Sequence, residues 1–140
     1  MTQEQKDLLL KDLCARLPYG VKLQNVNNIE SIVKLRSIDL DDYCCEISFY
    51  TYQGKALTIC DKSRLFRFGK ILRYKPCLFP LSSMTEEQIK QYTNLCAKDI
   101  ISGLYYNTPE SIDWLNKNHF DYRGLIERGL VNDATGLNIY

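Results

Sequence analysis

The stretch YCCEISFYTYQGKALTIC, residues 43–60, decides the fold class, because apolar and polar side chains alternate along it. Ser48 lies between Ile47 and Phe49, the spacing of a strand with one buried face. The pair at 53–54 ends in glycine, which accepts positive φ without a Cβ clash and suits a tight turn between two strands. The stretch therefore predicts a β-hairpin.

The alternation continues on both sides of this hairpin. It predicts four to five short strands, at about 20–26, 30–38, 43–52, 55–60 and 66–74. Turn-forming residues separate them, namely Asn25, Asn27 and Asn28 in one turn and Asp39, Asp41 and Asp42 in another. Such a run forms an antiparallel sheet, or closes into a small barrel that leaves no exposed edge.

A helix is predicted at residues 2–17, before the strands. Thr2 and Gln5 have the spacing of a capping box, and Pro18 stops the helix. Its expected buried stripe is Leu9, Leu10, Leu13, Cys14 and Leu17.

Helices are also predicted after the strands. Pro76 and Pro80 indicate an extended connector, and Thr85 with Gln88 forms a second capping box. The buried stripe of that helix is expected at Ile89, Tyr92, Cys96 and Ile100.

A third helix is predicted to start at Thr108-Pro109, with proline in the first turn and Ile112, Trp114 and Leu115 along it. Asp121 is expected to cap a last short helix that ends at Gly129. The tail is expected to dock on the body through Leu137, Ile139 and Tyr140.

These elements predict one α+β domain over 1–140, with a helix and a β-rich part in 1–75 and a helical part in 76–140. The 140 residues, 45% hydrophobic and 25% charged, match an ordinary globular domain. No apolar run approaches the roughly 20 residues of a membrane span, and the polar N-terminus is unlike a signal peptide. We therefore expect a cytoplasmic protein without membrane contact, whose six cysteines are free thiols.

Positive charge is concentrated in KSRLFRFGKILRYK, residues 62–75, which has six basic residues and no acidic one. The net charge of the whole chain is only +1, which argues against a body that is basic all round. Lysine and arginine among aromatic rings are typical of surfaces that bind phosphates and stack bases. The segment supplies the candidate anion- or nucleic-acid-binding residues Arg64, Arg67, Lys70, Arg73, Tyr74 and Lys75, unless it is simply a strand with a solvated face.

Arg123, in the sequence DYRG, is a further candidate for a carboxylate or phosphate contact. The alternative is a salt bridge within the fold, to Asp113 or Asp121.

Catalytic and metal patterns are weak. His119 near Asp121 could activate a thiol, but the chain has a single histidine and no C-x-x-C. The acidic group Asp39, Asp41, Asp42 and Glu46 lacks the glycine and distal glutamate of a calcium loop. We predict no catalytic residue, no metal and no cofactor.

Three segments resemble a family of small uncharacterised proteins of phages and prophages of gut Bacteroidales. They are LLLKDLCARLPYGVK (8–22), KPCLFPLSSMTEEQ (75–88) and IDWLNKNHFDYRGLIERGLVNDATGLNIY (112–140). Cys77 and Phe79 stand where the family's connector more often has tyrosine and arginine. The resemblance implies a phage origin and action in the bacterial cytoplasm, and it implies no activity.

The leading hypothesis is a non-enzymatic, phage-encoded accessory protein that binds a host protein or an anionic ligand and modulates the host or counters its defence. One alternative is a nucleic-acid-binding regulator that uses segment 62–75, and another is a cysteine-dependent enzyme. The sequence leaves the oligomeric state open.

Overall fold

The structure is a computed structural model that describes the backbone of residues 1–40, 45–53, 56–66 and 74–140. It describes the side chains of residues 1–38 and 74–140. The helices are α1 (Gln3–Arg16), α2 (Glu86–Leu95) and α3 (Pro109–Lys117), with short 3-10 turns η1 (Leu17–Tyr19) and η2 (Leu81–Ser83). The longer strands are β1 (Lys22–Asn25), β2 (Asn28–Leu40), β3 (Cys45–Gln53), β4 (Ala56–Phe66) and β5 (Tyr74–Pro80). The two-residue strands are β6 (Ala97–Lys98), β7 (Tyr105–Tyr106), β8 (Phe120–Asp121) and β9 (Asn132–Asp133). The α+β class is confirmed.

The described strands form one large sheet in the order β4-β3-β2-β1-β5-β8, with β9 also paired to β5. Pairing among β1 to β5 is antiparallel, as expected, whereas β8 and β9 join β5 in parallel. Because β4 and β8 lie at opposite ends of this order, the described strands form an open sheet and not the closed barrel.

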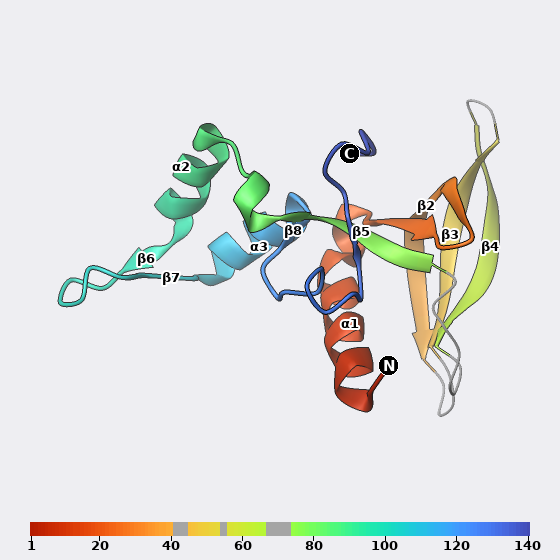
Figure 1. The fold of residues 1–140 in the computed structure, drawn as a ribbon, viewed down its shortest axis with the longest axis horizontal. Coiled ribbons are helices and arrows are strands. Elements are labelled where there is room, and N and C mark those ends of the chain that lie inside the picture. Colours follow the sequence, from red (N-terminus) through yellow and green to blue (C-terminus); the bar gives the residue numbers. More distant parts are fainter. Residues whose placement is uncertain (41–44, 54–55, 67–73) are drawn as a thin grey trace.

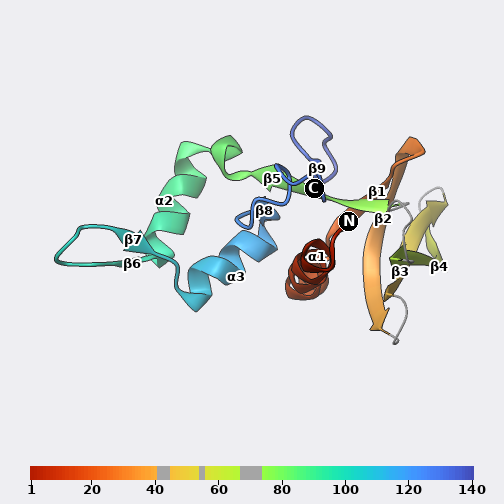
Figure 2. The same ribbon diagram turned by 60° about the horizontal axis from the view of Figure 1, so that its bottom comes forward.

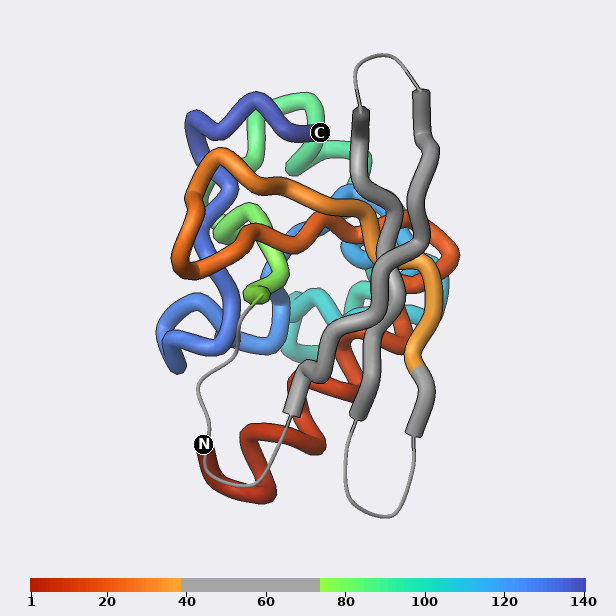
Figure 3. The backbone as a smooth tube through the Cα atoms, turned by 90° about the vertical axis from the view of Figure 1, so that its right-hand side faces the viewer, coloured from red at the N-terminus to blue at the C-terminus, as the bar shows by residue number. Residues whose placement is uncertain are grey.

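Helix α1 lies at the centre of the molecule, with β2, β3 and β4 on one side and α2, α3 and the β6–β7 hairpin on the other (Figure 1). In a second view α1 lies between α3 and β2 (Figure 2). Seen from the sheet end, the first strands and the C-terminal segment lie side by side (Figure 3). Asn132 donates a hydrogen bond to the Gln24 side chain there, at 2.7 Å. The hydrophobic core fills the space between α1 and the sheet, and its members are Leu9, Leu13, Val21, Leu23, Val33, Leu35, Tyr74, Leu78, Leu125, Leu130 and Val131.

Local sequence fixes the beginnings of all three helices. Thr2, Thr85 and Thr108 each accept a hydrogen bond from the backbone three residues on, in a complete capping box. The first two boxes confirm the prediction. Pro109 occupies the first turn of α3, as expected.

The buried stripe of α1 differs from the prediction. Leu9 and Leu13 are fully buried as expected, but the stripe continues through Asp12 and Arg16. Cys14 is exposed. Two charged side chains can occupy this face because they pair with each other.

The helix predicted around Ile89 to Ile100 is wrong in its second half. Helix α2 ends at Leu95, and Cys96 has left the helical conformation. Ile89 is 50% exposed and Ile100 is 98% exposed, so neither belongs to a buried stripe. The helical spacing of apolar residues in the sequence continues beyond Leu95, where the helix itself ends and the chain enters β6.

Three other predictions need correction. Residues 76–80, expected as a connector, belong to β5 in the interior of the sheet. The short helix expected after Asp121 is absent, and residues 125–129 form a turn. Strand 55–60 extends to Phe66, so Phe66 ends β4 and Tyr74 begins β5. The rest of the strand expected at 66–74 lies outside the described residues, as do Gly54 and the acidic turn at 41–42. No described helix is long and apolar enough to cross a bilayer.

Candidate functional site

The β6–β7 hairpin, residues 97–106, projects from the end of the molecule opposite the large sheet (Figure 1). Ala97 pairs with Tyr106 and Lys98 with Tyr105. The loop between the strands is closed by Asp99, whose N–H donates to the Leu104 carbonyl at 2.9 Å. Gly103, at φ +69°, supplies the left-handed residue that this loop requires.

The Asp99 carboxylate organises the tip of this loop. It accepts hydrogen bonds from the Ile101 amide at 3.0 Å and from the Ser102 hydroxyl at 2.6 Å. These bonds, the one from Ser102 first, lower the pKa of Asp99. The tip therefore has a defined conformation that its own side chains maintain.

That conformation exposes apolar side chains to water. Ile100 is 98% exposed and Ile101 is 97% exposed. Three residues of the same hairpin are exposed by half or more, Leu104, Tyr105 and Tyr106. We call these five residues the hairpin patch. Soluble proteins rarely leave contiguous apolar surface uncovered, and such patches mark interaction sites.

The base of the hairpin is tied to two helices. Tyr92 of α2 donates to the Asn107 side chain at 2.6 Å, and the Thr108 hydroxyl donates to the Leu95 carbonyl at 2.7 Å. The Tyr92 ring lies 6.0 Å from that of Trp114 in α3. A two-stranded hairpin is marginal by itself, so these contacts hold the patch in place.

Two of the anion-binding candidates in segment 62–75 are engaged within the fold. Tyr74 is 8% exposed and belongs to the hydrophobic core. Lys75 donates to the Gly129 carbonyl at 2.7 Å. Arg64 lies in β4 and its side chain is not described, while Arg67, Lys70 and Arg73 lie outside the described residues.

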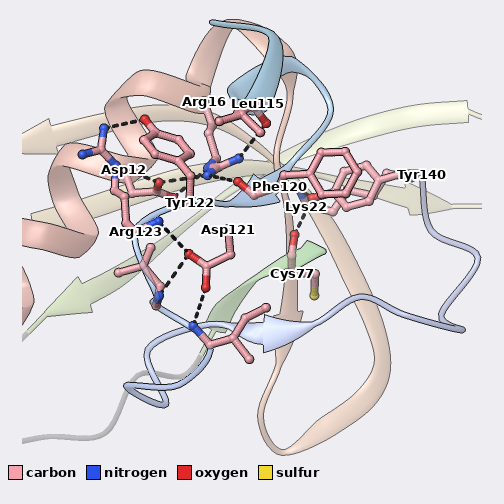
Figure 4. Close-up of polar contacts among 12 residues, drawn as sticks. Asp12, Arg16, Lys22, Cys77, Leu115, Phe120, Asp121, Tyr122, Arg123 and Tyr140 are labelled. Carbon is pink, nitrogen blue, oxygen red and sulfur yellow. Dashed lines mark hydrogen bonds and ion pairs between the residues drawn. The ribbon is translucent and has the colours of Figure 1, made fainter. Parts of the chain in front are cut away.

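Arg123 takes part in a buried ionic network (Figure 4). Its Nε donates to the Asp12 carboxylate at 3.2 Å, and its guanidinium lies 4.6 Å from the centre of the Tyr122 ring. The salt bridge expected within the fold is thus present, but its partner is Asp12 and not Asp113 or Asp121.

Arg16 is the centre of the same network. It binds both oxygens of Asp12, at 2.8 and 3.0 Å, and both side chains are completely buried. It also donates to the Phe120 carbonyl at 2.8 Å and to the Leu115 carbonyl at 3.4 Å. Arg16 therefore joins α1 to the ends of α3 and β8.

Among the described residues, Asp121 does not pair with His119 as the predicted thiol site would require. The Asp121 carboxylate accepts three backbone N–H groups, those of Arg123, Leu125 and Ile126. The Nδ1 atom of His119 has no hydrogen-bond partner among the described residues.

The described thiols do not indicate an activated nucleophile either. Cys14, Cys77 and Cys96 are free, and burial raises the pKa of Cys77 to about 11. Among the described residues no three His, Cys, Asp or Glu side chains come together as a metal site would need. The acidic group at Asp39, Asp41, Asp42 and Glu46 lies outside the described side chains.

Sequence reasoning misses the hairpin patch because Ile100 and Tyr92 have helical spacing, which predicts one buried stripe. The sequence IISG followed by LYY, at 100–106, does carry a signal, namely a turn between apolar residues. No family model, curated protein or solved structure matches this chain. The function must therefore be argued from its own surface.

Proposed function

We propose that this chain is a non-enzymatic binding protein that contacts another protein through the hairpin patch. The observation that carries the proposal is the almost complete exposure of Ile100 and Ile101, 98% and 97%, at an ordered tip. Burying such side chains against an apolar surface is favourable by about 1.5–3 kcal/mol each.

The order of the hairpin supports the same function. Asp99 holds the tip by its bonds to Ile101 and Ser102, and Tyr92 and Thr108 hold the base. A contact surface that is already ordered loses less conformational entropy on binding. The patch is therefore prepared to enter an apolar groove of a partner.

The proposed partner is a protein of the bacterial host. The resemblance of both ends of the chain to phage proteins motivates this choice, with modulation of that host protein as the consequence. Cys77 does not support the cysteine-dependent enzyme, because burial raises the pKa of its thiol to about 11 and keeps it protonated at neutral pH.

The nucleic-acid alternative depends on the six basic residues of segment 62–75. It predicts oligonucleotide affinity that falls steeply with salt concentration. An Arg67→Gln/Arg73→Gln variant would weaken that affinity and leave the protein contact unchanged.

The test is a comparison of two exposed isoleucine sites. We expect purified protein that carries a photo-crosslinking residue in place of Leu104, and is otherwise wild type, to form one discrete adduct in lysate of the bacterial host. Ile100→Asp/Ile101→Asp should abolish this adduct. The matched control is Ile29→Asp, because Ile29 is 72% exposed and lies in β2, outside the hairpin. It should leave the adduct intact.

Folding and self-association are checked on the same samples. Both variants should keep the wild-type melting temperature, since exposed side chains contribute little to stability. Sedimentation velocity shows whether the partner is a second copy, in which case the wild type is a dimer and Ile100→Asp/Ile101→Asp a monomer. An adduct unchanged in that double variant would refute the proposal.

A further inference from the structure

A cavity of about 510 Å³ lies where β5, α3, η2 and the C-terminal residue meet, lined in part by Phe79, Lys117, His119, Phe120 and Tyr140. This volume is within the range of small-molecule sites. The cavity shares no residue with the hairpin patch and has no part in the function proposed above.

Aromatic rings form one wall of the cavity. The Tyr140 ring stacks on the His119 imidazole with centroids 3.9 Å apart and planes 18° apart. Phe79 lies next to both Tyr140 and Phe120, at 5.7 and 6.1 Å. Such a wall offers ring faces and edges to a flat ligand.

Tyr140 is held in this wall by two hydrogen bonds of its hydroxyl. The hydroxyl donates to the Cys77 carbonyl and accepts from the Lys22 amide, at 2.9 and 2.8 Å (Figure 4). The Lys22 ammonium lies 5.5 Å from the centre of the same ring and donates to the Ile139 carbonyl. The wall is therefore formed in the free protein.

His119 contributes its ring to this wall, whereas its Nδ1 atom is buried. It is 7% exposed, and its Nδ1 has no hydrogen-bond partner among the described residues. Its backbone has φ of +60°, a conformation that costs energy and is concentrated at functional sites. Burial, followed by the charges of Arg16 and Lys22, lowers the pKa of His119 to about 4. The imidazole is neutral at pH 7, so it adds no charge to the cavity.

Among the side chains that line the cavity, Lys117 carries the charge, and it is positive. Lys117, at the last turn of α3, is exposed and borders the cavity, whereas no carboxylate side chain lines it. Asn118, Gln88 and Ser83 complete the lining with neutral polar groups. An acidic group on a ligand would meet the Lys117 ammonium without repulsion from an acidic side chain of the lining.

We propose that this cavity binds a small molecule that combines a flat aromatic ring with an acidic group. The ring would pack on the wall of Tyr140, His119 and Phe79, and the acid would pair with Lys117. A mononucleotide and an aromatic carboxylic acid share this chemistry, and the experiment separates them.

Trp114 is the only tryptophan of the chain and stacks on Phe120 at 5.7 Å, so its fluorescence reports on the cavity. The probes are AMP, indole-3-acetate, adenosine and inorganic phosphate. We expect AMP or indole-3-acetate to bind with a Kd below about 1 mM. For a probe that itself fluoresces, calorimetry replaces the fluorescence measurement. Adenosine and phosphate, which lack one of the two groups, should bind at least about tenfold more weakly. Preference for AMP identifies a nucleotide site, and preference for indole-3-acetate identifies a carboxylate site.

Two variants locate the binding. Lys117→Gln should weaken the preferred probe about fivefold, because the ion pair of an exposed lysine contributes only modestly. Lys11→Gln, the same change at an exposed position of α1, is the matched control and should have no effect on binding. Phe79→Leu should weaken the preferred probe and adenosine alike. No saturable binding of either ring-plus-acid probe, or equal affinity in Lys117→Gln, would overturn the proposal, and neither result bears on the hairpin patch.

Discussion

Two loops of this protein are organised by the same chemistry and end in opposite environments. In one, the Asp121 carboxylate accepts the N–H groups of Arg123, Leu125 and Ile126. In the other, Asp99 accepts the Ile101 N–H and the Ser102 hydroxyl. A glycine with positive φ follows in each case, Gly124 and Gly103.

The apolar residues of these loops differ in burial. Leu125 of the first loop is completely buried in the core beside α1, whereas Ile101 of the second loop is 97% exposed. An aspartate with nearby glycine fixes a turn, but it does not decide whether the turn is covered. What covers the first loop is the body of the protein, and we propose that a partner covers the second.

The largest expected effect tests the support of the buried loop. Arg16→Met removes the guanidinium from Asp12 and from the carbonyls of Leu115 and Phe120. Breaking a buried pair is strongly destabilising, so we expect a loss of about 4 kcal/mol in urea unfolding. Arg123→Met should lose about 1 kcal/mol, because that side chain is 18% exposed and Arg16 still holds Asp12. Equal losses of unfolding free energy in the two variants would contradict the central role of Arg16 in the network.

The next effect compares the two loops directly. Leu125→Ala should destabilise the protein by about 3 kcal/mol, because it leaves a cavity in the core. Ile101→Ala should change the free energy of unfolding by less than about 0.5 kcal/mol. A substantial loss in Ile101→Ala would mean that the hairpin patch is covered in the free protein.

The pH dependence of the unfolding free energy also tests the buried region, through His119. The pKa of His119 in the folded protein, about 4, lies below its ordinary value of 6.5. The unfolded chain therefore takes up a proton between these pH values while the folded chain does not, and stability falls as pH drops through 6.5 towards 4. We expect a loss of about 2 kcal/mol at pH 5 relative to pH 8 from this group.

The matched control for the pH effect is His119→Gln. Carboxylates titrate in both proteins, and both proteins contain Arg16 and Lys22, whose charges act on His119. The difference between the two unfolding curves isolates His119. Parallel curves from pH 8 to pH 5 would contradict the lowered pKa.

The smallest effect concerns the exposed loop alone. Asp99→Ala removes the acceptor of the Ile101 amide, so exchange of that amide hydrogen should accelerate roughly fivefold, the factor of one ordinary hydrogen bond. The urea midpoint should stay unchanged, because the loop contributes no side chain to the core cluster. Asn94→Ala, at an exposed position of α2 just before the hairpin, is the control and should leave the exchange of the Ile101 amide as it is in the wild type. Unchanged exchange at Ile101 in Asp99→Ala would show that Gly103 alone fixes the turn.

Local signals predicted much of the secondary structure. The boxes at Thr2 and Thr85, the proline at 109 and the turn at Asn25 to Asn28 all depend on contacts within a few residues. In that turn the Asn25 side chain accepts the Asn27 N–H at 2.9 Å. Signals of this range are complete in the sequence, because the atoms that satisfy each other are close neighbours along the chain.

Burial could not be predicted in the same way. Asp12 and Arg16 can occupy the buried face of α1 because they pair with each other and because the carbonyls of Phe120 and Leu115, about a hundred residues later, accept the other hydrogen bonds of Arg16. The buried stripe predicted from Ile89 to Ile100 is wrong for the opposite reason. Apolar spacing indicates which face of a helix could be buried, but it does not indicate whether another element packs on that face. The basic segment 62–75 remains a prediction.

The sequence by itself determined the turn at Asn25 to Asn28 and the beginnings of α1, α2 and α3, because each needs only neighbouring residues. Tertiary structure alone decided that Arg16 is enclosed, that His119 meets Tyr140, and that Ile100 and Ile101 face water. The physical reason is that burial belongs to pairs of surfaces distant in the chain, and no single segment contains both members of such a pair.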